Sequence, residues 1–260
     1  MNRESEPISA LGSVPTEAIA GFRVHAMDPA LFAASFIELL NSSDGGFVTL
    51  TGAHGVVEAA RSESLASAHR QAAIVVPDGY PLARIARRAS PSAIQMPGRD
   101  VFALASSIAS ALGKQQLLLG GPPGLAERTA DGLKRYNPAL KFLEPISPPF
   151  APLVEWDFDA LAQQVSESGA DVVWVGLSTP KQEEVMVQLL RRLPGCVFLG
   201  VGAAFDMWAG TVRIAPRAVQ RVHMEWAFRA LTEPRRLLRR YMKVVPAFAK
   251  IAVAERRRRA

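Results

Sequence analysis

The chain has 260 residues, 49% of them apolar, with one cysteine and a formal net charge of +6. The length and apolar content suffice for a sizeable core, arranged as one domain or two tightly joined halves. The lone Cys196 excludes an internal disulfide, and we expect it to pack within a strand. The polar start "MNRESEPISALGS" is unlike a secretory signal, and no segment approaches the ~20 apolar residues of a membrane span. These features predict a cytoplasmic protein.

The positive charge is concentrated at the C-terminal end. Residues 235–260 contain ten Lys or Arg and one Glu, which leaves 20 basic and 23 acidic residues in the rest of the chain. The body is therefore mildly acidic and the end strongly basic. This asymmetry predicts that the C-terminal segment binds an anionic surface.

In chain order, residues 1–20 predict a loosely attached lead, and Asp28 predicts the N-cap of the first helix. Apolar residues at helical spacing predict helices over 27–43, 56–72, 100–113, 123–137, 157–169 and 181–193. Continuous apolar runs predict strands over 46–50, 72–77, 115–121, 141–146, 171–177 and 196–202. Helical tendency continues beyond residue 220 as far as Pro246.

Alternating strands and helices predict the α/β class. Because the strands are continuously apolar, we expect a parallel sheet covered by helices on both faces. Such sheets bind ligands beyond the carboxyl ends of their strands. The loops that matter are therefore "TGAHG", "PDGYP", "GGPPG", "STPKQEE" and "GAAFDMWAG".

Asp78, at the end of one strand, has two interpretations. Asp-Gly is a common turn, whereas a carboxylate at a strand end also suits a general base for an incoming hydroxyl. Gly120 opens a glycine turn into a helix, which suits either a phosphate contact or a plain tight connection. His54 has no second His or Cys at metal-ligand spacing, so a zinc site is not indicated.

Two polar segments read mainly as helix starts. Asp157 and Asp159 resemble an Asp-x-Asp metal motif, but they open a predicted helix, where carboxylates stabilise the N-terminus without a ligand. In "STPKQEE", helix-start chemistry accounts for Ser178 and Pro180 but does not require Gln182.

Five segments together resemble a known family. They are "PDG", "LLLGG" with "YNP" downstream, "DVVWVGLSTPKQEE", "GVGAAFDMWAGTVRIAP" and "MEWAFRALTEPRRLLRRY". Their order is similar to that of the bacterial WecG/TagA/CpsF glycosyltransferases, from about Gly21 to Tyr241. The resemblance implies transfer of a sugar, of the N-acetylmannosamine type, from a UDP donor to a polyprenyl-diphosphate-linked acceptor in cell-surface polysaccharide synthesis. It further implies an inverting, metal-independent reaction on a Rossmann-like core, without a cofactor.

The resemblance also assigns residues. Asp78 becomes the catalytic base, Gln182 a substrate-site residue and Asp206 a contact to the nucleotide. The full set of expected substrate-binding residues is Thr49, Thr51, His54, Gly120, Gly121, Lys181, Gln182, Gly202, Phe205, Asp206, Arg229, Arg236 and Arg239.

The sequence departs from the family's pattern at three places. Thr51 takes the place of Asn in the usual Thr-x-Asn, and Ile214 takes the place of Arg in the usual Arg-Ala-Pro. The segment "GLSTPKQE" replaces the commoner Gly-Ala-Pro start. These changes leave the reaction type in place and the particular sugar open, with UDP-glucose and a UDP-uronic acid as alternatives.

The C-terminal segment is expected to act at the site and at a membrane. Arg229, Arg236 and Arg240 share one face if a single helix continues through them, and guanidinium groups match phosphate oxygens. Pro234 can interrupt that helix. We expect a glycosyltransferase domain over 21–241 and, over 242–260, a basic amphipathic tail that lies on the inner face of the cell membrane.

Functions of other classes stay open. A nicotinamide-dependent oxidoreductase suits the α/β pattern but lacks the spaced-glycine fingerprint. A nucleic-acid-binding module would rest on the basic tail alone, and we expect no nucleic acid partner. A silent scaffold is disfavoured by the presence of both Asp78 and Gln182. Nothing in the sequence fixes the oligomeric state, so self-association into a homo-oligomer is left open.

Overall fold

The computed structural model describes residues 14–259, except for the side chains of residues 235, 236, 258 and 259. Its strands are β1 (Thr16–Ile19), β2 (Phe22–His25), β3 (Gly46–Thr51), β4 (Ile74–Pro77), β5 (Gln116–Leu119), β6 (Val172–Val175) and β7 (Val197–Gly200). Its helices up to β6 are α1 (Pro29–Asn41), α2 (Ala53–Ala59), α3 (Glu63–Gln71), α4 (Tyr80–Ala86), α5 (Gly98–Ala111), α6 (Leu125–Tyr136), the 3-10 turn η2 (Leu153–Glu155) and α7 (Phe158–Glu167). After β6 come α8 (Lys181–Arg192), α9 (Ala204–Trp208), α10 (Arg217–Arg221), α11 (Glu225–Thr232) and α12 (Pro234–Arg259).

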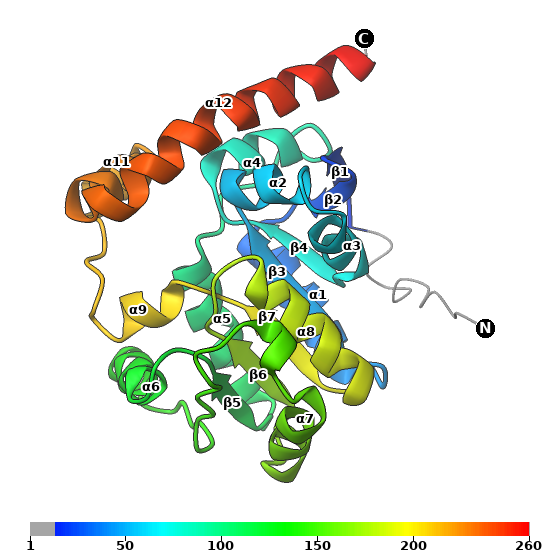
Figure 1. Ribbon diagram of the computed structural model, residues 1–260, viewed down its shortest axis with the longest axis vertical. Helices are drawn as coiled ribbons and strands as arrows, with labels where there is room; N and C mark the ends of the chain where they lie inside the picture. The colour runs from blue at the N-terminus through cyan, green and yellow to red at the C-terminus, as the bar shows by residue number, and fades with distance from the viewer. Residues whose placement is uncertain (1–13, 260) are drawn as a thin grey trace.

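Five strands form the expected parallel sheet, in the order β4-β3-β7-β6-β5. Helices cover both faces (Figure 1). On one face, Phe36 of α1 and Phe102 of α5 belong to the cluster that contains Trp174 of β6. On the other, Leu161 of α7 and Val185 of α8 belong to a second cluster. Burial on both faces explains why the strands are apolar throughout, so the α/β prediction is confirmed.

Local chemistry sets the helix boundaries. Asp28 Oδ1 accepts a hydrogen bond from the Leu31 amide at 2.8 Å and caps α1, as expected. Ser62 caps α3 in the same way and thereby splits the single helix expected over 56–72 into α2 and α3. Cys196 is buried and its Sγ donates to the Ala170 carbonyl at 3.1 Å, which confirms a packing role.

The strand expected over 141–146 is not formed. This segment runs beside β5 and makes backbone hydrogen bonds from Leu143 and Ile146, with one isolated bridge between Leu119 and Ile146. Pro145 lies between these two residues and has no N–H, so a regular ladder is interrupted.

The N-terminal part is more ordered than expected. Of the predicted lead, residues 1–13 lie outside the described residues, but residues 16–19 form β1 and pair with β2 in an antiparallel hairpin. Ala20 and Gly21 both have positive φ, which is typical of a two-residue hairpin turn. Ile19 and Phe22 are buried in a third apolar cluster.

The basic end of the chain is one long helix. α12 crosses the expected boundary at residue 241 and continues through Pro246 (Figure 1). It packs against α2 and β1, and Phe248 and Ile251 lie against the cluster that contains Ile19. Among the described helices, none is both long enough and apolar enough to span a bilayer.

Gly176 makes a close approach at the carboxyl end of β6. A Cβ placed there would lie 2.3 Å from the ring of Phe205. Gly176→Ala is therefore expected to lower the free energy of unfolding by about 2–3 kcal/mol, because the ring must move within a packed core. Urea unfolding measures this change.

Gly113→Ala is the matched control, because no atom lies within 4 Å of its added Cβ. Its positive φ of 70° still carries a cost of about 1 kcal/mol. If Gly176→Ala and Gly113→Ala lower the free energy of unfolding equally, contact with Phe205 is not the reason that glycine is required at position 176.

Candidate active site

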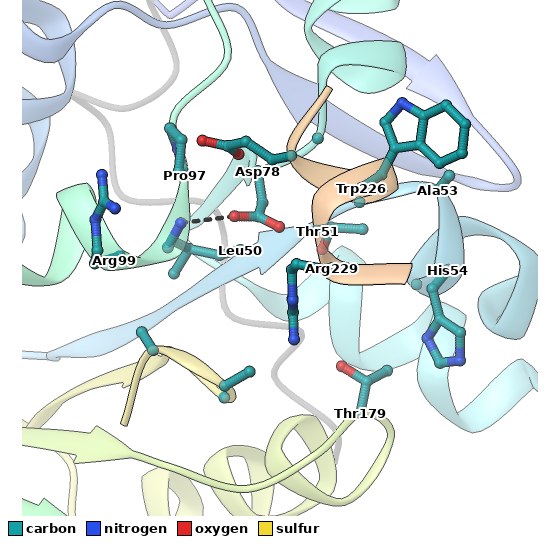
Figure 2. A pocket seen from close by; sticks show the side chains of 18 of the residues that line it. Leu50, Thr51, Ala53, His54, Asp78, Pro97, Arg99, Thr179, Trp226 and Arg229 are labelled. Carbon is teal, nitrogen blue, oxygen red and sulfur yellow. Dashed lines mark hydrogen bonds between the residues drawn. The ribbon is translucent and has the colours of Figure 1, made fainter. Parts of the chain in front are cut away.

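A cavity of about 600 Å³ lies at the carboxyl ends of the parallel strands. Loops after β3, β4, β6 and β7 form its floor and one wall, and residues of α11 and α12 form the other wall. Segments from the first and last thirds of the chain therefore meet here. Figure 2 shows part of this cavity, with Asp78 and Arg229 on neighbouring elements.

Asp78 follows β4 directly and faces the cavity. Its Oδ1 accepts a hydrogen bond from the Gly98 amide at 2.6 Å, drawn as the dashed line in Figure 2. Its backbone amide donates to the Thr51 carbonyl. Within the described part of the chain, no donor engages Oδ2. Although the residue is partly open to the cavity, the surrounding protein desolvates the carboxyl group and raises its pKa, against the opposing effects of the Gly98 hydrogen bond and Arg229. A carboxylate with one oxygen held and the other free suits proton abstraction.

Arginines from the two C-terminal helices line the opposite wall. Arg229 of α11 lies 3.6 Å from Glu233, and Arg240 of α12 lies over the Tyr241 ring. The Nε atoms of Arg229 and Arg240 are buried without a hydrogen-bond partner among the described residues. Unpaired guanidinium donors at a cavity wall favour an anionic ligand, because phosphate oxygens accept such bonds in pairs.

A second carboxylate, Glu225, also lines the cavity. Burial raises its pKa first and the nearby Asp78 raises it further, while Arg99 and Arg229 oppose the shift. His54 has a lowered pKa because of burial and the charge of Arg240. Glu225 was not among the residues expected at the site, although it lies within the segment "MEWAFRALTEPRRLLRRY".

The sequence stretch "STPKQEE" places a buried polar cluster beneath the cavity. Glu183 Oε1 accepts from Gln182 Nε2 at 2.9 Å, from Thr179 Oγ1 at 3.0 Å and from Thr49 Oγ1 at 3.5 Å. Thr51 Oγ1 lies 3.4 Å from Thr49 Oγ1. The cluster continues to His69, whose Nε2 is 2.8 Å from Thr51 Oγ1.

Burial raises the pKa of Glu183 to about 7, although three donors favour its charged form. A folded-state pKa above the unfolded value means that the folded chain loses stability as pH rises from about 4.5 to 7, because Glu183 must ionise in a dry site. Across that window the loss is on the order of 3 kcal/mol.

Glu183→Gln should remove this loss. We therefore expect the stability difference between the wild type and the variant to shift against the wild type as pH rises from 5 to 8. Urea unfolding at the two pH values measures the shift, and taking the difference cancels titration of other groups. A difference that stays constant with pH would contradict a raised pKa at Glu183.

The structure brings some predicted site residues together and not others. Those that line the cavity are Thr51, His54, Asp78, Gln182, Gly202 and Arg229. Those that do not line it are Thr49, Gly120, Gly121, Lys181, Phe205, Asp206 and Arg239. The predicted side chain of Arg236 lies outside the described residues.

The residues outside the cavity have structural partners. Lys181 Nζ donates to the Ala151 carbonyl at 3.0 Å, and Asp206 accepts from Thr211. Phe205 is fully buried in the core, and Gly120 allows the ends of β5 and β6 to approach, since an added Cβ would lie 2.8 Å from the Gly176 carbonyl oxygen. Arg239 is exposed, and Arg240 occupies the cavity wall in its place.

An aromatic pair borders the cavity. His223 stacks on Tyr80 with ring centroids 4.1 Å apart, and its Nδ1 lies 3.0 Å from Gln95 Oε1. His223 has a φ of 56°, a strained conformation for a residue with a side chain. This contact joins the loop between α10 and α11 to α4. Nothing in the spacing of the sequence indicated it.

Asp157 and Asp159 act as helix-start residues. Asp157 Oδ1 accepts from the amides of Asp159 and Ala160 and caps α7, and Asp159 pairs with Arg192 at 2.6 Å. Within residues 14–259, no group of three or more His, Cys, Asp or Glu side chains is arranged to hold a metal ion.

Two comparisons bear on the chain. A family model described as "Glycosyl transferase WecG/TagA/CpsF family" matches residues 17–260. Among solved structures, the chain is similar to a substrate-binding periplasmic protein from Ralstonia solanacearum, with 11% identity and a TM-score of 0.32. That match covers 71% of this chain and 53% of the other, so the chain spans about half the length of the structure it matches.

Proposed function

Because the chain belongs to the WecG/TagA/CpsF family of glycosyl transferases, we propose that it moves a sugar from a UDP donor to a polyprenyl-diphosphate-linked acceptor. The chain is thus a transferase, which uses a sugar donor and an acceptor. The observation that supports the finer proposal is one cavity in which Asp78 lies across from Arg229 and Arg240. A base and a cationic wall are what transfer from a nucleoside diphosphate requires.

In the proposed reaction, Asp78 Oδ2 accepts the proton of the acceptor hydroxyl. The freed oxygen attacks the anomeric carbon from the face opposite the leaving group and forms the new glycosidic bond. The bond between that carbon and the diphosphate oxygen breaks, and its electron pair leaves with UDP. Attack from the opposite face inverts the configuration at the anomeric carbon. Arg229 and Arg240 stabilise the charge that develops on the diphosphate, and no metal is assigned a role.

A panel of UDP-sugars tests the proposal. UDP-N-acetylmannosamine, UDP-glucose and a UDP-uronic acid would each be incubated with a synthetic polyprenyl-diphosphate sugar, and UDP release would be followed. We expect release that depends on the lipid acceptor and persists in a chelator. Consumption of none of these donors would overturn the proposal. Turnover that stops in chelator and returns with a divalent ion would overturn its metal-independent part.

The outer surface of α12 supports docking on a membrane. Leu238, Met242, Val245 and Val253 are exposed and lie within one stripe of the helix, away from the face that carries Phe248. Val245 also lines the cavity, so the apolar stripe reaches the cavity mouth. We propose that this stripe meets the acyl region at the inner membrane face, where a lipid-linked acceptor is presented.

The cations at the end of α12 are expected to contribute most of the attraction to anionic lipid. Each basic residue near such a surface contributes about 1 kcal/mol, so changing residues 256–259 from Arg to Gln should lower affinity for phosphatidylglycerol vesicles by at least about a hundredfold. Co-sedimentation with the vesicles measures the loss. Turnover of a short, water-soluble acceptor should stay unchanged, because Arg256 and Arg257, the two of these residues whose side chains the structure describes, do not line the cavity.

The matched control changes four exposed basic residues elsewhere to Gln. They are Arg128, Lys134, Arg135 and Lys141. This control variant alters the net charge by the same amount as the variant of residues 256–259, and it should weaken vesicle binding far less. Equal losses in the two variants would show that net charge, and not α12, governs binding.

A further inference from the structure

Glu183 collects side chains from three separate segments. Thr49 comes from β3, Thr179 from the loop after β6, and Gln182 from the first turn of α8, and all three donate to the same oxygen, Oε1. Glu183 is 1% exposed and does not line the cavity itself. Its contacts therefore act on the site only through its partners.

The bond to Glu183 determines which end of the Gln182 amide faces the cavity. Gln182 Nε2 donates to Glu183 Oε1 at 2.9 Å and lies 3.4 Å from Thr179 Oγ1. If the amide were turned over, its carbonyl oxygen would face Glu183 Oε1, which already accepts from Thr49 and Thr179 and stays an acceptor even when Oε2 carries a proton. Glu183 thus allows one orientation of the amide.

In that orientation Gln182 Oε1 is a buried acceptor without a partner. Gln182 is 3% exposed, yet it lines the cavity. Among the described residues, no donor reaches Oε1. The nearby wall is backbone, since a Cβ added at Gly202 would lie 3.4 Å from Oε1. A buried acceptor left unpaired is costly, so a ligand that brings a donor is favoured.

We propose that Glu183 is a positioning residue that fixes Gln182 so that its Oε1 accepts a hydrogen bond from a hydroxyl or N–H group of the nucleotide-sugar. The inference rests on the proposed function and adds to it a requirement on the ligand. A group that only accepts hydrogen bonds is excluded at this point of the cavity.

Within this proposal Gln182 is assigned to the donor substrate. Asp78 follows β4, whereas Gln182 lies in the first turn of α8 after β6, so the two side chains approach the cavity from different strands of the sheet. On this assignment Gln182 does not contact the hydroxyl that Asp78 deprotonates, and its loss should raise KM for the donor more than it lowers kcat.

A double-mutant cycle separates positioning from general stability. Isothermal titration with UDP and with UDP-N-acetylmannosamine would be run on the wild type, Glu183→Met, Gln182→Ala and the double variant. Glu183→Met removes the acceptor at nearly constant volume and should weaken binding of at least one probe about tenfold. In the Gln182→Ala background the same change should have no further effect on binding, although it should still lower stability.

Glu183→Gln keeps an acceptor oxygen and should restore binding to within about threefold of the wild type. Wild-type binding by Glu183→Met, or a loss that adds fully to that of Gln182→Ala, would overturn the inference. If Glu183→Met weakens binding of both UDP and UDP-N-acetylmannosamine, the hydrogen-bond donor to Gln182 Oε1 belongs to the nucleotide. If it weakens binding of UDP-N-acetylmannosamine alone, that hydrogen-bond donor belongs to the sugar.

An NMR measurement distinguishes failure of this inference from failure of the proposed function. The side-chain amide signals of Gln182, assigned by their loss in Gln182→Ala, should include one proton protected from exchange in the wild type without ligand. This needs no folded variant at position 183. A freely exchanging amide would overturn the inference alone, whereas a wild type that binds neither probe would overturn the proposed function and, with it, the assignment of the ligand.

Discussion

Asp78→Asn is expected to lower kcat for sugar transfer by about a thousandfold, within the range for the loss of a general base. Asn has nearly the same shape, and its amide oxygen keeps the hydrogen bond from the Gly98 amide, so the strand end should be undisturbed. What is lost is an oxygen able to take the proton of the acceptor hydroxyl. Initial rates of UDP release with the lipid-linked acceptor measure the effect.

Binding of UDP should survive in this variant. Removal of a negative charge beside Arg229 leaves the cationic wall intact, so titration with UDP should give a Kd equal to or slightly below that of the wild type. Asp159→Asn is the matched control, because Asp159 is exposed and pairs with Arg192 on the surface. Full turnover by Asp78→Asn would mean that another group serves as the base, and Glu225 is a candidate because it is a second carboxylate that lines the cavity.

Arg240→Ala is expected to lower kcat by about a hundredfold, the typical effect of removing one donor that stabilises developing charge. The Nε atoms of Arg240 and Arg229 are both buried in the cavity wall and have no hydrogen-bond partner among the described residues. Arg240→Lys keeps the charge but not the paired donors, and it should recover only part of the activity. Steady-state kinetics over both substrates would separate the change in kcat from a change in KM.

The neighbouring residue supplies the control. Arg239 carries the same charge one position earlier on α12, but it is exposed and does not line the cavity. Arg239→Ala should therefore retain nearly all activity. Similar losses in the two variants would mean that the general charge of α12 matters and that Arg240 has no specific contact with the diphosphate.

The sequence located the floor of the cavity because parallel strands present their carboxyl ends at a common edge. That rule requires only that each strand and its direction be recognised, and the apolar runs of β3, β4, β6 and β7 sufficed. The apolar runs do not indicate which side chains at the strand ends reach the surface of the cavity and which are covered. Thr49 and Thr51 lie on the same side of β3, two residues apart, but Glu183 covers Thr49 and leaves Thr51 at the surface of the cavity.

The C-terminal wall was predicted less well, for a reason of helix geometry. The assumed face of Arg229 and Arg240 required one continuous helix, but α11 ends at Thr232 and α12 begins at Pro234. At this break the helical phase is reset, and spacing along the chain no longer reports which side chains share a face. The hairpin of β1 and β2 was missed because each strand has only 4 residues and β1 carries no alternating apolar pattern.

The division of the cavity between distant parts of the chain has a consequence for biosynthesis. The hairpin, the sheet and Asp78 are translated first, while the guanidinium wall belongs to α11 and α12, which emerge last. A nascent chain halted before α11 would therefore carry the Asp78 carboxylate without the arginines that complete the cavity.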